Sequence, residues 1–295
     1  MSARRATDAV SAWLFRALAF GAAGLAAVVL VALWLKSRPL LAHQSLGSLL
    51  WSSDWQPHAG SFGFLPYLAG TIAVTGVAMV MAVPVSVLAA IYLAEYATNR
   101  LRSAVKPLID LLAAIPSVVY GMWGVVVIVP AVKHIAASFG VSCTGYSLLA
   151  AGVVLAVMVF PFLVSIIADV LHAVPLDARE AALALGATRW ETTWHIVLKH
   201  AAPGIMAAIV LSFSRAFGET MAVVMVAGNV AAIPRSLFAP VYPLPALIAN
   251  NYGEMMSIPL YDAALMFAAL ALFVVVTLFN TAAHVVLHQL ERRWR

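Results

Sequence analysis

Six stretches of the chain are apolar almost without interruption, and polar residues gather between them. A helix must present about 20 apolar residues to cross the hydrocarbon core of a bilayer. The stretches that reach this length are residues 12–35, 67–94, 107–132, 147–171, 204–228 and 261–286. The pattern therefore predicts an all-α, polytopic membrane protein with about six transmembrane helices.

Two of the segments between the predicted spans are long. Residues 36–66 mix polar and apolar positions, and we expect a short interfacial helix among them. Residues 229–260 include five prolines, which are Pro234, Pro240, Pro243, Pro245 and Pro259. So many prolines exclude a regular helix throughout that segment. It must therefore lie outside the hydrocarbon or be covered by protein, because lipid cannot satisfy its backbone groups.

Several predicted spans hold prolines, among them Pro84, Pro116, Pro130 and Pro161. The ordinary interpretation of such prolines is a kink in a membrane helix. Pro116 is the exception, because the sequence "IPSVVYG" places Ser117, Tyr120 and Gly121 in the turn that follows it. These residues offer hydroxyl groups and a close approach of backbone, so Ser117 and Tyr120 are candidate site residues.

Composition supports a membrane protein and excludes a water-soluble one. Of the 295 residues, 64% are hydrophobic and 10% are charged, whereas soluble domains are close to half apolar and a quarter charged. The net charge of +5 could indicate a nucleic-acid partner, but the basic residues are scattered between apolar runs and form no basic face. Cys143 is the single cysteine, which excludes an intrachain disulfide and a thiolate metal cluster.

The distribution of Lys and Arg predicts the orientation of the spans. Four basic residues fall on one side, which are Lys36, Arg38, Lys133 and Arg235. Twelve fall on the other, which are Arg4, Arg5, Arg16, Arg100, Arg102, Lys106, Arg179, Arg189, Lys199, Arg292, Arg293 and Arg295. Basic residues are enriched on the cytoplasmic side of membrane proteins. We therefore expect both termini to be cytoplasmic, in a bacterial plasma (inner) membrane.

The inner segment at about 173–203 is too polar to span and too apolar for a plain linker. Pro175 and Asp177 indicate a helix start, and Gly186 permits a turn before the helical pattern resumes. The sequence predicts a helix, a Gly turn and a second helix facing the cytosol. Such a hairpin could be grasped by another protein or could rest on the membrane surface, and the spacing favours neither.

Two opposite charges, Arg215 and Glu219, interrupt the apolar stretch 204–228. An arginine near the bilayer centre costs about 2.5–3.5 kcal/mol on insertion scales. Residues four apart share a helix face, so Glu219 is expected to neutralise Arg215. Intramembrane charges usually mark a pathway, and we interpret the pair as functional, although an ion pair that only fixes packing is the alternative.

Other polar residues carry less weight. Asp169 and His172 lie three apart at the inner end of the fourth span, but two possible ligands without a third do not indicate a metal site. Glu95 and Asp110 are interpreted as interface charges. No GxxxxGK[ST] loop occurs in the sequence, so ATP hydrolysis is not expected of this chain, and neither HExxH nor GxSxG is present. The chain is predicted to be no enzyme, with no bound cofactor.

The inner segment resembles a known family. "EAALALGATRWETTWHIVLK" is similar to the EAA loop of ABC-importer permeases. The residues that match the family pattern are Glu180, Ala181, Ala182, Gly186, Ile196 and Leu198, whereas Lys199 stands where the family usually has proline. The resemblance implies an ABC-importer permease fold, in which this loop docks into a groove on a cytoplasmic ATPase and transmits its closure to the spans.

Three further stretches narrow the resemblance. "FGFLPYLAGTIAV", "LAAIPSVVYGMWG" and "RAFGETMAVVMVAGN" are similar to PstC-type permeases of phosphate-specific ABC importers, from about residue 55 to the C-terminus. The resemblance implies inward transport of inorganic phosphate. It also implies a PstA-like second permease, two PstB-like ATPases that use ATP and Mg, and a PstS-like extracytoplasmic binding protein. Residues 1–66 are then an N-terminal span with an outer segment, and residues 67–295 are the permease core.

Phosphate chemistry fits the charges in span five. Guanidinium presents a planar fork of donors that suits phosphate oxygens. Monohydrogen phosphate also carries a proton that a carboxylate can accept, and sulfate carries none. Arg215 is therefore a candidate anion station and Glu219 its proton acceptor or support; a gate formed by the pair is the rival version. Competing functions are a permease for phosphonate or sulfate, a scaffold that signals phosphate status, and, less favoured, a secondary transporter.

Overall fold

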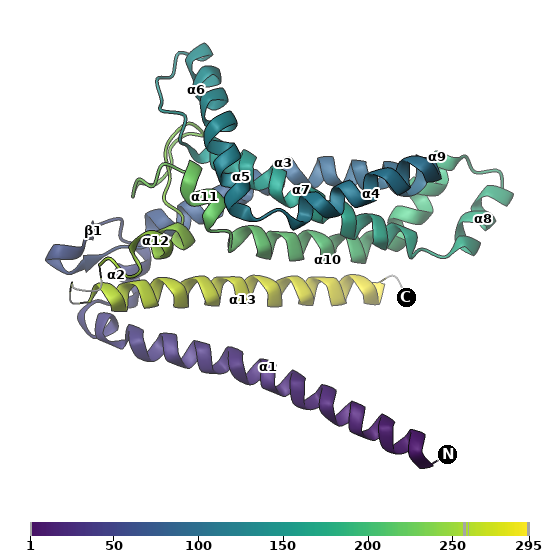
Figure 1. Ribbon diagram of the computed structural model, residues 1–295, viewed down its shortest axis with the longest axis horizontal. Helices are drawn as coiled ribbons and strands as arrows, with labels where there is room; N and C mark the ends of the chain where they lie inside the picture. Colours follow the sequence, from purple (N-terminus) through teal and green to yellow (C-terminus); the bar gives the residue numbers. More distant parts are fainter. Residues whose placement is uncertain (1, 256–257, 259, 294–295) are drawn as a thin grey trace.

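A computed structural model describes residues 2–255, 258 and 260–293 as an elongated helical protein (Figure 1). The α-helices are α1 (Ser2–His43), α2 (Leu46–Trp51), α3 (Leu65–Ile91), α4 (Asn99–Ala114), α5 (Ser117–Trp123), α6 (Val129–Ser138), α7 (Leu148–His172), α8 (Leu176–Ala184), α9 (Arg189–Thr192), α10 (Leu198–Phe217), α11 (Met221–Val226), α12 (Leu244–Asn251) and α13 (Tyr261–Arg293). Strands β1 (Trp55–Gln56) and β2 (Ser61–Phe62) form a small antiparallel hairpin around the 3₁₀ turn η1 (Pro57–Ala59). The predicted all-α class is confirmed.

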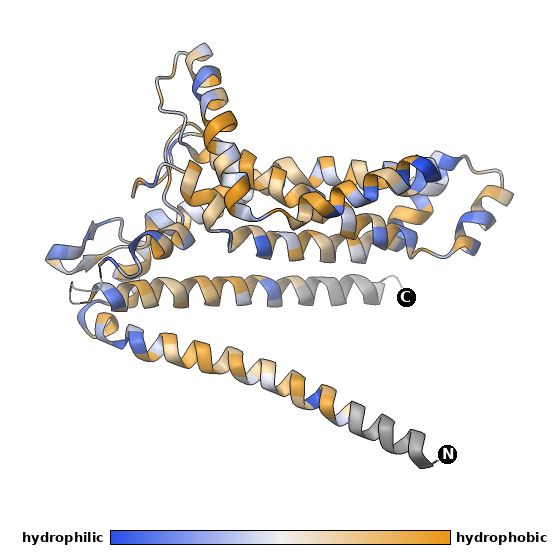
Figure 2. Ribbon diagram, viewed as in Figure 1, coloured by the Kyte–Doolittle hydropathy of each residue, from blue (hydrophilic) through white to orange (hydrophobic). Residues whose placement is uncertain are grey.

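Six helices among the described residues are long and apolar enough to cross a membrane, as predicted. They are Ala12–His43, Leu65–Tyr96, Ser117–Ser138, Leu148–His172, Arg189–Phe217 and Tyr261–Ala283. Hydropathy colouring shows the apolar residues along these helices and polar residues gathered around α8 and α9 (Figure 2). The outer segments also follow the prediction, because α2 is a short helix within residues 36–66 and α12 is a short helix that covers only a part of residues 229–260.

Two predicted spans have the wrong bounds. The third span begins at Ser117 and not at residue 107, because Ile115 and Pro116 are extended, with ψ of 131° and 139°. A residue before proline is forced out of the helical region. Residues 107–114 therefore belong to α4, a separate amphipathic helix. The fifth span runs from Arg189 to Phe217 and ends well before residue 228.

The core lies where α3 and α7 pack along each other. Gly152 of α7 brings the two helices close together, since a side chain there would strike Val77. Small residues let backbones approach in membrane proteins, where packing replaces the hydrophobic drive. Helices α4 and α10 pack against α7, and α13 packs against α10. This arrangement holds the ends of α4, α7 and α10 in fixed relation.

The first helix stands apart from this core. Helix α1 packs against α13 and diverges from it toward the N-terminal end (Figure 1). No residue in the most apolar 18-residue stretch of α1 is buried, so the apolar surface of this helix faces lipid or other proteins. The outer ends of α1 and α13 lie beside each other, and their opposite ends lie at the same end of the molecule as α8 and α9 (Figure 1).

An aromatic cluster closes the outer end of the molecule. The Trp55 ring makes edge contacts with Phe62, Phe64, Tyr67 and Tyr261, at centroid separations of 5.3, 5.4, 4.9 and 5.9 Å. Such edge-to-face pairs add to the stability that burial provides. The cluster joins the β1–β2 hairpin to α3 and α13, so it fixes the outer segment on the spans.

Three π-helical turns interrupt the regular helices in the described part of the chain. They are η2 (Tyr92–Tyr96), η3 (Gly124–Ile128) and η4 (Thr193–Val197). Each turn accommodates one extra residue and shifts the helix register, and such turns are frequent at functional sites. η2 ends the second span, η3 lies inside the third, and η4 joins the inner loop to α10.

Candidate functional site

The fifth span breaks inside a stretch that the sequence shows as uniformly apolar. Helix α10 ends at Phe217, residues 218–220 are not helical, and α11 begins at Met221. Backbone at membrane depth can leave the helical conformation only where protein covers it or where it lines a water-filled cavity. In transporters, broken helices of this kind often form substrate sites. The break is therefore a candidate site for transport chemistry.

Arg215 lies in the last turn of α10, immediately before the break. A cation is stabilised there by the unpaired carbonyl groups at the helix end. Its guanidinium carbon lies 4.7 Å from the centroid of the Phe162 ring on α7, which is a cation–π contact. The side chain is otherwise exposed in the isolated chain, so its donors are accessible.

The predicted ion pair between Arg215 and Glu219 is wrong. The break destroys the i, i+4 geometry on which the prediction rested, and no ion pair joins these two residues in the described part of the chain. Glu219 Oε1 instead accepts a hydrogen bond from the backbone N–H of Ala222, at 3.2 Å, in the first turn of α11. Each charge thus lies at the helix end that it complements.

The hydroxyl groups near Arg215 mostly serve packing. Ser214 Oγ donates to the carbonyl of Val210 at 3.0 Å and also contacts Asn280 Oδ1 of α13. Thr220 Oγ1 donates to the carbonyl of Gly218 at 3.2 Å, within the break. Ser214 therefore ties α10 to α13.

The structure brings Tyr120 into the neighbourhood of Arg215. Tyr120 is buried on α5, close enough to Arg215 for the two side chains to interact electrostatically. Its hydroxyl donates to the carbonyl of Leu112 at 2.8 Å and so holds α5 against the end of α4. Ser117 is half-buried in the first turn of the same helix. The role of both residues on a substrate path stays a prediction.

Helix α5 lies directly against α11 at Gly121. A Cβ atom at this position would lie 2.7 Å from Met225 Sδ, 3.2 Å from Ala222 Cα and 3.3 Å from the Met221 carbonyl oxygen. Met225 can move aside, but the two backbone groups cannot. Gly121 therefore sets the distance between the third span and the short helix after the break.

Gly121→Val should loosen this contact. Overpacking a tight site costs about 1–3 kcal/mol, so we expect a lower Tm for the detergent-purified protein than for wild type. Gly76→Ala on α3 is the matched control, because nothing lies within 4 Å of a Cβ there. A Tm for Gly121→Val equal to that of Gly76→Ala would show that the two helices are not packed as described.

The inner loop forms the helix, Gly turn and helix that the sequence predicts. Gly186 has a φ of +89°, a conformation that favours glycine, between α8 and α9. Thr188 and Glu191 form a capping box that starts the second helix. That helix continues through η4 and Lys199 into α10 without a break, so lysine in place of the family's usual proline leaves the loop exit helical.

The surface of this loop is apolar and exposed. Leu176, Leu183, Leu185, Trp190 and Trp194 are 68%, 45%, 90%, 59% and 52% exposed. Glu180 and Ala181 are also exposed, Ala182 and Ile196 are half-buried, and the loop projects from one end of the molecule (Figure 1). Exposed apolar residues in such number mark an interaction surface.

Arg179 joins this loop to the spans, which the sequence interpretation missed. Arg179 Nη1 lies 2.8 and 3.0 Å from the two carboxylate oxygens of Glu95, and Nη2 donates to the Leu171 carbonyl at 2.6 Å. The Arg179 and Glu95 side chains are 17% and 12% exposed. Glu95 ends the second span and Leu171 the fourth, so one guanidinium ties α8 to both. Glu95 is thus a partner of the loop and no simple interface charge.

Comparison with known proteins places the chain in a family. Residues 82–295 match the family model described as "Binding-protein-dependent transport system inner membrane component". The chain belongs to this family of inner-membrane permeases. It is 37% identical over 261 residues to the phosphate transport system permease protein PstC of Pasteurella multocida, which covers 83% of this chain and 81% of the relative. It is 38% identical to PstC of Xylella fastidiosa strain 9a5c, over 95% of this chain and 90% of the relative.

Solved structures of ABC importers share the fold of the permease. A bacterial alginate ABC transporter in complex with its substrate-bound periplasmic protein matches with a TM-score of 0.63 and 16% identity, over 92% of both chains. The inward-facing MetNI methionine transporter matches with a TM-score of 0.58 and 21% identity, over 75% of this chain and 93% of that chain. The chain is therefore the inner-membrane component of a binding-protein-dependent transport system and not itself an enzyme, and the solved structures show that its fold is that of ABC-importer membrane subunits.

Proposed function

We propose that this permease carries inorganic phosphate into the cytoplasm as the PstC-type subunit of an ATP-driven importer. Its relatives from two organisms are phosphate transport system permease proteins, and the chain covers most of their length. The observation that carries the proposal is Arg215, a guanidinium exposed at a helix break inside a membrane span and not neutralised by Glu219. An accessible arginine at membrane depth is suited to an oxyanion in transit.

Arg215 acts as a transient anion station in this proposal. One arginine held by a cation–π contact attracts phosphate without binding it strongly, and the ion must leave. One carboxylate oxygen of Glu219 accepts the Ala222 N–H, and the other remains to accept a hydrogen bond from the P–OH group of monohydrogen phosphate. Ser117 and Tyr120 lie on α5 beside the same region and complete the proposed path. Sulfate, which has no such proton, is repelled by Glu219 without compensation.

The partners follow from the same proposal. A PstA-like permease covers the exposed face that carries Arg215, so that the path lies between the two subunits. Two PstB-like ATPases, which use ATP and Mg, receive the exposed loop that contains Glu180, Ala181, Ala182 and Gly186, and a PstS-like protein delivers phosphate from outside. Residues 67–295 form the transport core in this assembly, and residues 1–66 an added span and outer segment.

Uptake by the assembled importer tests the proposal. The chain is reconstituted in liposomes with its partner subunits and binding protein, and uptake of labelled phosphate and of labelled sulfate is measured with and without ATP. We expect ATP-dependent uptake of phosphate and none of sulfate. Sulfate uptake equal to phosphate uptake would refute the assigned substrate. ATP hydrolysis without uptake of either ion would refute phosphate transport and favour a signalling scaffold.

A further inference from the structure

A pocket with a basic rim lies at the inner end of the spans, away from the helix break. It lies between α4 and α7, with Leu93 of η2 at one edge, and its volume is about 160 Å³. A single water needs only about 10–15 Å³ of such space. Its walls are formed by the apolar residues Leu93, Ile109, Val164 and Ala168. The pocket therefore has room for a ligand much larger than water, with an apolar part.

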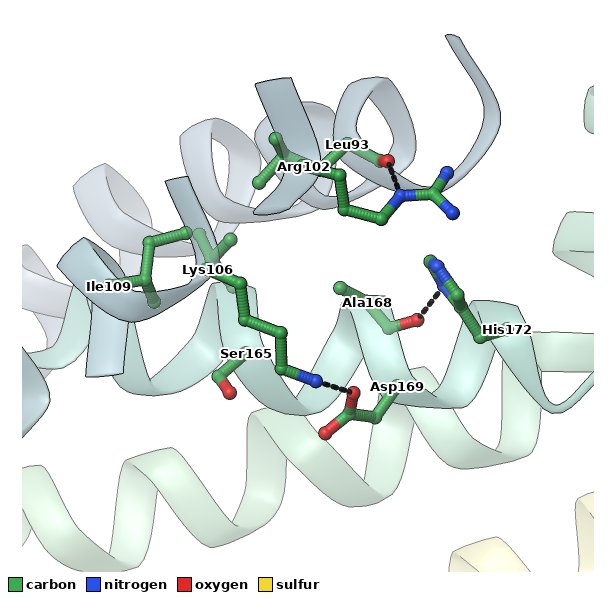
Figure 3. A pocket seen from close by; sticks show the side chains of 9 residues that line it. Leu93, Arg102, Lys106, Ile109, Ser165, Ala168, Asp169 and His172 are labelled. Atoms are coloured by element: carbon green, nitrogen blue, oxygen red, sulfur yellow. Dashed lines mark hydrogen bonds and ion pairs between the residues drawn. The ribbon is translucent and has the colours of Figure 1, made fainter. Parts of the chain in front are cut away.

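Five polar side chains line this pocket, and four of them, besides Ser165, can carry charge (Figure 3). Arg102 and Lys106 enter from α4, and Asp169 and His172 from α7. Lys106 Nζ lies 3.1 Å from Asp169 Oδ1, and the two side chains are 60% and 65% exposed. An ion pair so exposed is worth at most about 1 kcal/mol, so Lys106 can exchange its partner. With His172 neutral, the formal charge of the rim is +1.

Arg102 is fixed in place by the backbone. Its Nε donates to the Leu93 carbonyl at 3.0 Å and its Nη2 to the Ala94 carbonyl at 2.6 Å, which caps the end of the second span. The half-buried guanidinium is thereby held at one side of the pocket, facing His172 (Figure 3). A guanidinium that is already ordered loses little entropy when it binds an anion.

Helix α4 has the character of an interfacial helix. It carries Arg100, Arg102 and Lys106 on the cytoplasmic side, and its Leu101, Leu108, Leu111 and Leu112 are 38%, 58%, 65% and 44% exposed. Arg102 and Lys106, four residues apart, share one face of the helix, and the leucines lie on another. Such an arrangement places a helix at the membrane surface. The pocket thus opens where phosphate groups of the inner leaflet lie.

We propose that this pocket binds the phosphate group of an anionic phospholipid from the inner leaflet. Basic pockets between spanning helices on the cytoplasmic side suit such headgroups. A phosphodiester carries one negative charge, which matches the rim, and the apolar walls accept the glycerol and the first part of an acyl chain. Free inorganic phosphate offers the same oxygens but nothing for the apolar walls, and it carries up to two charges.

Lipid retention by the assembled importer tests this site. The detergent-purified complex is titrated with phosphatidylglycerol and, separately, phosphatidylcholine, and the retained lipid is counted by native mass spectrometry. Lys106→Gln should weaken phosphatidylglycerol retention by about five-fold, the effect of one basic residue near a membrane surface. Ala168→Leu, which fills the pocket and changes no charge, should also weaken it. Arg100→Gln, on the same helix but outside the pocket, should have little effect.

Three outcomes would overturn the site. Equal losses in Lys106→Gln and Arg100→Gln would show only general surface attraction. Phosphatidylcholine has the same phosphodiester, but its choline neutralises the charge of the headgroup. Retention of this lipid equal to that of phosphatidylglycerol would show that the pocket does not select an anionic phospholipid. Binding of labelled inorganic phosphate that Lys106→Gln abolishes, with no retained lipid, would assign the pocket to the free ion. None of these results depends on whether the importer transports phosphate.

Discussion

Replacement of Arg215 by alanine is expected to remove ATP-dependent phosphate uptake while the importer still assembles. The guanidinium offers charge-assisted hydrogen bonds to the passing anion, each worth about 1.5–3 kcal/mol. Their loss corresponds to an uptake rate about 10- to 100-fold lower. The measurement is initial uptake of labelled phosphate in liposomes, together with ATP hydrolysis by the same preparation.

Three further variants separate the effect of the guanidinium from other effects of the substitution. Arg38→Ala removes an exposed arginine from α1 and should transport like wild type. Arg215→Lys keeps the charge but loses the planar fork of donors, so its uptake should fall between that of Arg38→Ala and that of Arg215→Ala. Glu219→Gln keeps an acceptor for the Ala222 N–H, so the helix break survives while the proton acceptor is lost. Wild-type uptake in Arg215→Ala would reduce Arg215 to a packing residue.

Arg179→Ala is expected to uncouple ATP hydrolysis from transport. Arg179 is the contact through which α8 holds the ends of the second and fourth spans. Without it, closure of the ATPase still moves the loop, but the movement reaches the spans less well. The loss of its charge-assisted bonds predicts about a ten-fold drop in phosphate transported per ATP hydrolysed. The ratio is measured in liposomes, because total uptake alone would not separate coupling from assembly.

The partner residue sharpens this test. Glu95→Ala should lower the ratio in the same way, and the double variant should be little worse than either single one, because both remove the same contact. Arg189→Ala is the matched control, an exposed arginine in the same loop, and its ratio should match wild type. An unchanged ratio in Arg179→Ala would assign the contact to stability alone.

The six spans could be predicted because the membrane demands long apolar helices, and that demand is visible in hydropathy. The break at Gly218 could not, because residues 204–228 are apolar on both sides of it and glycine is common in membrane helices. The start of the third span was also wrong, although Pro116 supplied the signal that places a helix boundary before it.

Among the site residues, those with an unusual position in the sequence could be predicted, and contacts that depend on the fold could not. Arg215 was identifiable, because a charge in an apolar stretch stands out in any reading of the sequence. Its relation to Glu219 was not, since that depends on whether the helix continues. The sequence offered only a weak indication of a role for Arg179, which is a basic residue directly before the Glu-Ala-Ala pattern of the EAA loop. Its contact with Glu95 spans 84 positions, and only the packing of α8 against the spans reveals it.

The π turn η4 fixes the rotational phase between the inner loop and Arg215. An α-helix turns by about 100° and rises by about 1.5 Å per residue. If Thr193–Val197 were wound as a regular α-helix with no residue removed, α8 and α9 would be swung around the axis of α10 by about that angle. Arg179 would then face away from Glu95 while Arg215 stayed in place. The π winding of this turn, as much as any side chain, therefore sets the direction in which a movement of the loop reaches the membrane.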